Sequence, residues 1–193
     1  TVTATDADQP AQTLSYSIVG GADAAKFSIN ASTGALSFLA APDFEAPTDV
    51  GADNVYDVIV QVADGQGGTD SQAIAVTVTS ANDNAPVITS SATASVAENT
   101  TAVMTVTATD ADQPAQTLSY SIVGGADGAQ FSINASTGAL SFLAAPDFET
   151  PTDVGGDNVY DVIVQVADGQ GGTDSQAIAV TVTSANDNAP VIT

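Results

Sequence analysis

The sequence predicts an all-β protein made of two tandem β-sandwiches, each with seven strands in Greek-key order. Three observations support this fold class. Apolar residues recur at every second position, the whole pattern repeats after 104 residues, and no stretch has the spacing of an amphipathic helix. Alternating runs rich in β-branched and aromatic residues indicate half-buried strands. Seven short strands in about 100 residues are typical of a sandwich.

The strands are separated by segments rich in glycine and aspartate. The clearest alternation lies in "TLSYSIV" at 13–19, "YDVIVQVAD" at 56–64 and "AIAVTVT" at 73–79. The punctuation between strands includes "GGADAA", "ASTGA" and "ADGQGGTD", which favour turns. In the second copy of the repeat we expect strands at 87–95, 102–109, 117–123, 130–133, 138–142, 158–167 and 175–183.

The repeat defines the domain organisation. Residues 1–89 align with residues 105–193 and differ at four positions. These are Ala24/Gly128, Lys26/Gln130, Ala46/Thr150 and Ala52/Gly156. We expect a first domain at 1–84 that lacks its first strand and a complete second domain at 85–193 that ends in the next linker. Because the chain is cut in phase with neither repeat boundary, we expect it to be part of a longer array.

The charge balance excludes several classes of function. One basic residue, Lys26, stands against 23 acidic residues, which gives a formal net charge of −22. Nucleic acids and anionic membranes bind through Lys and Arg, so neither is expected as a partner. The chain has no cysteine and no histidine. Disulfides, thiol nucleophiles, imidazole bases and ordinary transition-metal sites are therefore excluded.

Most of the acidic residues follow the ends of predicted strands. If successive strands alternate in direction, the turns after the first, third, fifth and seventh strands lie at one end of a sandwich, and the other turns lie at the opposite end. A short linker would bring one end of the first domain to the opposite end of the second. The residues expected at that junction are Asp43, Glu45, Asn82, Asp83, Asn84, Asp110, Asp112 and Asp168. So many oxygen ligands without a basic partner favour Ca²⁺, which takes six to eight oxygens, over the more strictly octahedral Mg²⁺.

The same rule predicts half-sites at the outer ends of the two domains. One consists of Asp6, Asp8 and Asp64. The other consists of Glu98, Asp147, Glu149, Asn186, Asp187 and Asn188. Each would lack the ligands that a neighbouring domain supplies.

Five motifs in order resemble those of cadherin repeats in their bacterial form. They are "TDAD", "LSYSI", "PDFE", "YDVIVQVADG" and "ANDNAP", and together they extend over nearly the whole chain. The resemblance implies a cadherin-like, Ig-like sandwich with calcium ions at each interdomain junction. It assigns ligand roles to the eight junction residues given above, with Asn84 acting through its carbonyl oxygen. Ser80 and Ser184 depart from the family pattern, which has Asp there, so fewer ions are expected at the 80–87 junction.

The resemblance implies a calcium-stiffened stalk or adhesion module of a large bacterial surface or secreted protein. Its expected location is extracellular, and its expected roles are homophilic or cell–matrix adhesion and biofilm formation. The expected partners are neighbouring repeats of the same array, further copies of the protein, or polysaccharide. An unpaired strand edge in the first domain would also accept "APVIT" at 189–193 of a neighbouring copy, giving head-to-tail assembly.

Two other readings remain beside this one. A calcium-dependent carbohydrate-binding module is the alternative, because Ca²⁺ can bridge sugar hydroxyls at an open half-site. An enzyme is not expected: a glycosidase needs paired carboxylates, but the aromatic residues read as core rather than as a sugar platform. Taken alone, the "TDAD" acids are typical turn residues. A metal site is favoured because the other acidic clusters are expected at the same junction.

Overall fold

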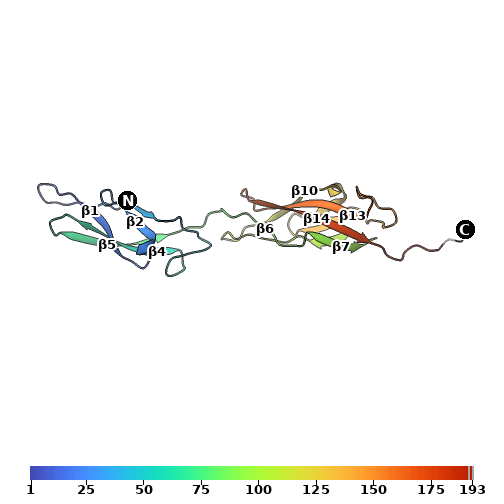
Figure 1. Ribbon diagram of the computed structural model, residues 1–193, viewed down its shortest axis with the longest axis horizontal. Coiled ribbons are helices and arrows are strands. Elements are labelled where there is room, and N and C mark those ends of the chain that lie inside the picture. Colours follow the sequence, from blue (N-terminus) through green and yellow to red (C-terminus); the bar gives the residue numbers. More distant parts are fainter. Residues whose placement is uncertain (191, 193) are drawn as a thin grey trace. The chain divides into compact units, whose positions relative to one another are not determined.

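The computed structural model describes residues 1–190 and 192, and its internal contacts divide the chain into two units. The first unit is Thr1–Ala81 and the second is Asn82–Thr193. Both are almost entirely β-structure, with one short 3-10 helix described in each, η1 (Ala24–Lys26) and η2 (Gly128–Gln130) (Figure 1). No helix among the described residues is long and apolar enough to cross a membrane.

The second unit contains all seven expected strands. One sheet has the order β10 (Ser119–Gly124), β13 (Val159–Ala167), β14 (Thr173–Thr183), β7 (Thr93–Ala97), with β7 parallel to β14 and the other pairs antiparallel. The facing sheet has the order β11 (Phe131–Ile133), β12 (Ala139–Phe142), β8 (Ala102–Thr105). A two-stranded ladder joins β6 (Val87–Ile88) to β9 (Ala108–Thr109). The sandwich fold predicted from the sequence is confirmed.

The first strand differs from the expected single strand at 87–95. It forms two pieces that pair with different sheets: β6 pairs with β9, and β7 pairs with β14. Between them, residues 89–92 cross from one sheet to the other, held where the Thr89 N–H donates to the Thr107 carbonyl oxygen at 2.8 Å. The second strand is likewise interrupted, into β8 and β9. Residues 87–97 thus pair with both sheets, and they can do so only because the chain leaves β9 after β6 before it joins β14 as β7.

The first unit contains the counterparts of five of these strands. Its larger sheet has the antiparallel order β1 (Ser15–Gly20), β4 (Val55–Ala63), β5 (Thr69–Thr77), and its smaller sheet pairs β2 (Phe27–Ile29) with β3 (Leu36–Phe38). β5 ends two residues earlier in the repeat than β14 does. In the second unit those last residues pair with β7, and the described residues of the first unit contain no such strand.

Candidate metal centres

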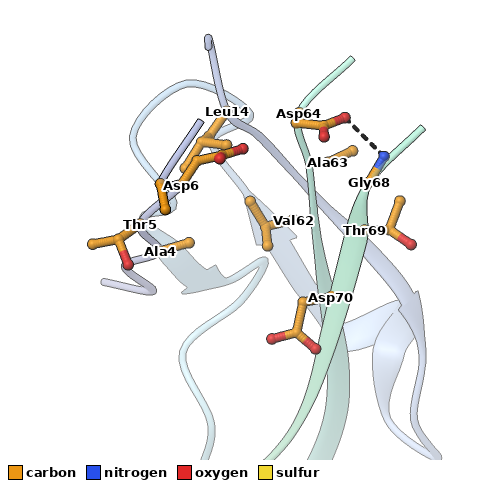
Figure 2. Close-up of a pocket in the computed structure, with 11 residues that line it drawn as sticks. Ala4, Thr5, Asp6, Leu14, Val62, Ala63, Asp64, Gly68, Thr69 and Asp70 are labelled. Atoms are coloured by element: carbon orange, nitrogen blue, oxygen red, sulfur yellow. Dashed lines mark hydrogen bonds between the residues drawn. The ribbon is translucent and has the colours of Figure 1, made fainter. Parts of the chain in front are cut away.

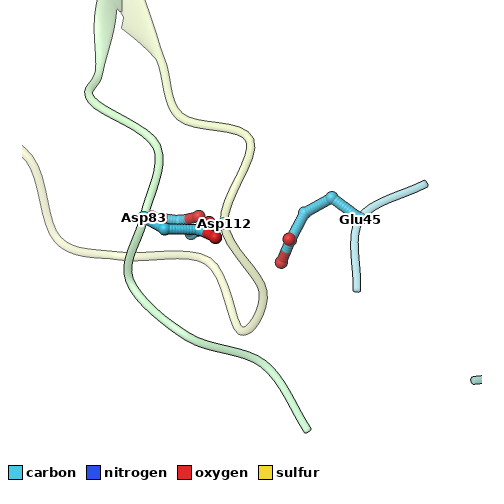
Figure 3. A group of neighbouring side chains, drawn as sticks. All are labelled: Glu45, Asp83 and Asp112. Atoms are coloured by element: carbon cyan, nitrogen blue, oxygen red, sulfur yellow. The ribbon is translucent and has the colours of Figure 1, made fainter. Parts of the chain in front are cut away.

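The first acidic cluster of the second unit lies where residues 82–84 run beside the loop that follows β9 (Figure 3). The Asn84 backbone N–H donates to both carboxylate oxygens of Asp112 at 3.3 Å, and the Asn84 side-chain amide donates to Asp112 Oδ1 at 2.7 Å. The same amide donates to Asp83 Oδ1 at 3.0 Å. Figure 3 shows the carboxylates of Asp83 and Asp112 side by side. Two negative charges therefore share one amide donor.

The loop that joins β13 to β14 supplies a third carboxylate to this cluster. The Asn82 side-chain amide donates to Asp168 Oδ2 at 3.2 Å, while Asp168 Oδ1 accepts the N–H groups of Gln170 at 2.7 Å and Gly172 at 3.0 Å. These backbone donors, Gln170 first, hold the pKa of Asp168 below its ordinary value although burial acts to raise it. Asp168 is thus kept as an anion with little solvent around it.

Asp110 is the fourth carboxylate of the cluster, and one of its oxygens has no hydrogen-bond donor. Its Oδ1 accepts the Asp112 N–H at 3.1 Å, but its Oδ2 is buried and has no hydrogen-bond partner. Asp112 is 1 % exposed, and the only basic side chain of the whole sequence, Lys26, belongs to the other unit. A buried carboxylate oxygen without a donor or a counter-charge is costly. A bound cation would remove that cost, so these residues fit a metal ion.

Gln116 also reaches the first acidic cluster. Its side-chain amide donates to Asp112 Oδ2 at 3.2 Å and to Asn82 Oδ1, while its own Oε1 is buried without a partner. Sequence reasoning missed Gln116 because glutamine in a turn carries no metal-ligand signal. Its position four residues after Asp112, in the same loop, is the feature that links it to the cluster.

The second acidic cluster of the second unit contains Glu98, Asp147 and Glu149. Their carboxylates each offer an oxygen within 4.8 Å of the others. Glu98 is 2 % exposed and accepts the N–H groups of Phe148 at 2.7 Å and Ala185 at 2.6 Å. Asp147 and Glu149 are exposed, so this cluster is open to solvent on one side.

Residues that follow β14 add to the second acidic cluster. The Asn99 side chain, on a backbone with φ of 63°, donates to Asp187 Oδ2 at 2.6 Å. The Asn188 side chain donates to Asp187 Oδ1 at 2.8 Å. Asn186 is exposed, and it is the one residue of the predicted half-site that none of these contacts includes. Asn99, which the sequence analysis did not single out, fixes Asp187 from a position next to Glu98.

In the first unit, Asp6, Asp8 and Asp64 are less buried than their counterparts 104 positions later. Asp6 and Asp64 line one pocket (Figure 2), whereas Asp8 is exposed and donates its N–H to Asp6 Oδ1 at 2.9 Å. Asp43 Oδ1 accepts the N–H groups of Glu45 at 3.0 Å and Ala46 at 3.2 Å, as Asp147 does in the second unit. No aromatic side chain is among the described residues that line the pocket, which offers no stacking surface for a sugar.

The fold and the acidic loop ends define a tandem array of small β-sandwich domains. A family model described as "Cadherin domain" matches residues 1–79 and 92–183. The chain therefore belongs to the cadherin domain family. Membership in a family of adhesion modules agrees with the expectation that the chain is not an enzyme.

Relatives in animals share up to about a third of the sequence over most of the chain. Human Protocadherin Fat 1 is 32 % identical over 92 % of this chain, and mouse Protocadherin Fat 4 is 35 % identical over 98 %. In both cases the match covers 4 % of the relative, so the chain spans a small part of the length of these proteins.

Solved structures of cadherin domains agree in fold. Human Protocadherin-24 EC1-2 matches with a TM-score of 0.69 and 21 % identity over 92 % of this chain and 85 % of that chain. Drosophila N-cadherin EC1-4 matches with a TM-score of 0.69 and 19 % identity over 91 % of this chain and 43 % of that one. At these identities the likeness concerns the fold alone.

Proposed function

We propose that this chain is a calcium-stiffened segment of an extracellular cadherin-domain array that serves adhesion. The observation that carries the proposal is the first acidic cluster of the second unit, where Asp110 Oδ2 is buried without a donor and Asp110 Oδ1 accepts the N–H of the buried Asp112. Carboxylates, amide carbonyls and backbone carbonyls are the oxygen donors that Ca²⁺ prefers.

The proposed ligands fall into a central set and two outer sets. In the central set, Asp83, Asp110, Asp112 and Asp168 contribute carboxylates, while Asn82 and Asn84 contribute carbonyl oxygens. Asp43 and Glu45 complete the central set. With the proposed domain boundary at 84/85, both belong to the first domain. Asp6, Asp8 and Asp64 form one outer set. The other comprises Glu98, Asp147, Glu149, Asn186, Asp187 and Asn188. This assignment rests on the repeat and on the contacts within each unit.

Ion binding would couple the junction to the folded state by mass action. A ligand that binds the folded form alone stabilises it by about 2.7 kcal/mol when its concentration is a hundredfold above Kd. Extracellular calcium modules have Kd values of roughly 10⁻⁴ to 10⁻³ M, so the array would be loose in a calcium-poor cytosol and stiff outside the cell. Stiffness is what a domain that connects or extends adhesive tips requires.

The proposed setting is a long surface or secreted adhesin of a bacterium, acting in homophilic or cell–matrix contacts. The support lies in the near identity of the two repeats and in the resemblance of the five motifs to bacterial cadherin repeats. Two copies that differ at four positions suit a spacer that gains length by duplication. The partners would then be neighbouring repeats and further copies of the protein.

The test is thermal unfolding of the whole chain in EDTA and along a Ca²⁺ titration, with Mg²⁺ as control. We expect the melting temperature to rise into the millimolar range of Ca²⁺ and the rise to be blunted by Asp110→Ala. The control is Asp161→Ala, which removes an exposed carboxylate of β13 that is not a proposed ligand. A melting temperature that ignores Ca²⁺ would contradict the proposal and leave the acids as solvated loop ends.

A further inference from the structure

Each unit has a pocket beside its short 3-10 helix. In the second unit the pocket has a volume of about 440 Å³ and lies between η2 and residues 142–152, and we call it the η2 pocket. Its counterpart in the first unit, the η1 pocket, has about 330 Å³ and lies between η1 and residues 38–48. Both volumes fall in the range of about 300–1,000 Å³ that is usual for ligand sites.

The lining of the η2 pocket is mostly apolar. Phe142 is 4 % exposed and Pro146 is buried, whereas Leu143, which also lines the pocket, is 65 % exposed. The remaining apolar lining consists of Ala129, Ala144 and Ala145. A leucine this open to water, next to a buried phenylalanine, offers apolar surface on which a ligand can pack.

Hydrogen bonds fix the polar edge of the η2 pocket. The Gln130 side-chain amide donates to the Thr152 carbonyl oxygen at 2.9 Å, and Gln130 Oε1 accepts the Thr152 hydroxyl at 3.0 Å. The Leu143 N–H donates to the Gln130 carbonyl oxygen at 2.8 Å. Gln130 is thus held by both its side chain and its backbone, so little conformational entropy is lost when a ligand binds beside it.

Asp147 gives the η2 pocket its charge. It is exposed, and its Oδ1 accepts the N–H groups of Glu149 at 3.0 Å and Thr150 at 3.1 Å. Among the described residues that line the pocket, Asp147 is the only charged one. The single basic residue of the sequence, Lys26, belongs to the first unit. The field at the η2 pocket is therefore negative and favours a cationic ligand.

The two pockets differ where most of the repeat does not. All ten residues that line the η2 pocket have counterparts in the lining of the η1 pocket, and two of these ten positions differ. The differences are Lys26/Gln130 and Ala46/Thr150, half of the four that separate the repeats. A third difference, Ala24/Gly128, lies in the same 3-10 helix. The apolar walls are thus identical, while the polar edge has changed.

The Lys26/Gln130 difference changes the charge of the lining. In the η1 pocket the ammonium group of Lys26 accompanies the carboxylate of Asp43, so the lining has no net charge. In the η2 pocket the carboxylate of Asp147 has no such companion. Two pockets with the same apolar walls therefore differ by one unit charge, which is the property that selects between charged ligands.

We infer that the η2 pocket binds a basic segment of a partner protein, whose apolar side chain packs on Phe142 and Leu143 while a neighbouring lysine or arginine pairs with Asp147. An apolar anchor in a pocket, with polar contacts around it, is the usual arrangement of a strong protein contact. The formal charge of −22 attracts a basic segment from a distance. The η1 pocket rejects the same segment, because Lys26 repels its charge.

The ligand class is tested by NMR titration of the isotope-labelled chain in EDTA, so that calcium at Asp147 makes no contribution. The probe is the blocked peptide acetyl-Lys-Leu-Lys-amide. Shifts are expected at the N–H groups of Gln130, Leu143 and Asp147, and much smaller ones at their counterparts 104 positions earlier. Acetyl-Lys-Ala-Lys-amide should bind about tenfold more weakly, since it lacks the apolar anchor. Equal binding of acetyl-Glu-Leu-Glu-amide, or no binding of the first probe, would overturn the inference.

The role of the charge is tested by exchanging the residues that differ. Gln130→Lys should weaken binding at the η2 pocket about fivefold, the ratio that one like charge at about 4 Å produces in water. Lys26→Gln combined with Ala46→Thr makes the ten shared lining positions identical and should give the η1 pocket the affinity of the η2 pocket. This second variant tests a gain of binding, which a folding defect cannot imitate. Shifts that spread over the acidic loops of both units and ignore these exchanges would overturn the inference.

Discussion

The two units differ at four positions over residues 1–81 and 105–185, yet they bury very different cores. Thirteen buried apolar residues form the core of the second unit and four form that of the first. Val164 and Val166 are fully buried, whereas of their counterparts Val60 is 2 % exposed and Val62 is half-buried. Almost the same sequence thus gives two degrees of burial, because residues 85–104 are part of the second unit alone.

The half of each sandwich that is built from local contacts is the same in both units. Phe27 stacks on Phe38 with ring centroids 4.5 Å apart, and Phe131 stacks on Phe142 at 4.4 Å. In both units a tyrosine, Tyr56 or Tyr160, meets the stacked pair edge-on. These aromatic contacts need no residue from 85–104, so the comparison separates what the repeat builds alone from what that segment adds.

The largest expected effect is a difference in stability between the units. Calorimetry of the whole chain in EDTA should show two transitions, with the first unit melting at least about 10 °C below the second. Each fully buried apolar side chain contributes about 1.5–3 kcal/mol, and 1 kcal/mol shifts the melting temperature of such a domain by about 4–8 °C. Hydrogen exchange would show which unit unfolds in each transition. A single transition shared by both units would contradict the expected difference in stability.

A glycine close to backbone should matter equally in both units. Gly125 has φ of 102°, and a Cβ there would lie 2.4 Å from the Asp161 carbonyl oxygen; Gly21 has φ of 105° and the same distance to Asp57. Gly125→Ala and Gly21→Ala should each destabilise their own unit by about 3 kcal/mol, since the strain is local. Chemical unfolding followed separately for each unit measures the effect. Unequal losses would show that residues 85–104 influence this turn.

A valine in the last strand should matter unequally. Val180 is fully buried in β14, while its counterpart Val76 in β5 is half-buried. Val180→Ala should cost about 2 kcal/mol of unfolding free energy, and Val76→Ala about 1 kcal/mol or less, because a cavity forms only in the closed sandwich. The two variants are compared by denaturant melts of the same chain. Equal costs would indicate that the edge of β5 is covered in solution.

The smallest expected effect concerns acid. Burial raises the pKa of Asp49 and Asp153, but the N–H groups of Asp53 and Asn54, and of Asp157 and Asn158, outweigh it, so both pKa values are lowered. A lowered pKa in the folded state gives stability that is complete above the unfolded value of about 3.9 and is lost as pH falls through the folded value.

Asp153→Asn should therefore flatten the fall in melting temperature of the second unit between about pH 4 and pH 2. Asp49→Asn should do the same for the first unit, since the loop is alike in both. The measurement is the melting temperature as a function of pH. A variant that keeps the full acid dependence would show that other carboxylates cause it.

Much of the fold follows from sequence periodicity, and the exceptions have a physical cause. The alternation of Tyr160, Val162, Val164 and Val166 predicts a strand with one buried face, and the structure has it. The break of the first strand at residues 89–92 begins at "TSS", three polar residues in a row that interrupt the alternation, but a polar run does not say that the two pieces pair with different sheets. Periodicity records which face is buried and contains no information on which neighbour a strand pairs with.

For the candidate site, strand parity predicts which acids share an end of a sandwich, and in the second unit Glu98 does lie near Asp147 and Glu149. The contacts of Asp112 with Asn84 and of Asp168 with Asn82 join residues that are distant in sequence. Gln116 and Asn99 escaped prediction because amide side chains are common in turns for local reasons. Their roles depend on which carboxylate lies opposite, and that is a property of the folded loops.

The most direct test of the account compares matched aspartates by calorimetric titration of the whole chain with Ca²⁺. Asp112 is buried beside Asn84 and Asp110, whereas Asp8, its counterpart in the first unit, is exposed. We expect Asp112→Ala to weaken calcium binding by about tenfold or more, the result of losing a charged ligand, and Asp8→Ala to weaken it by less, because the ligands of its outer set are more exposed. Equal effects of the two substitutions, or no calcium binding by the unaltered chain, would contradict it.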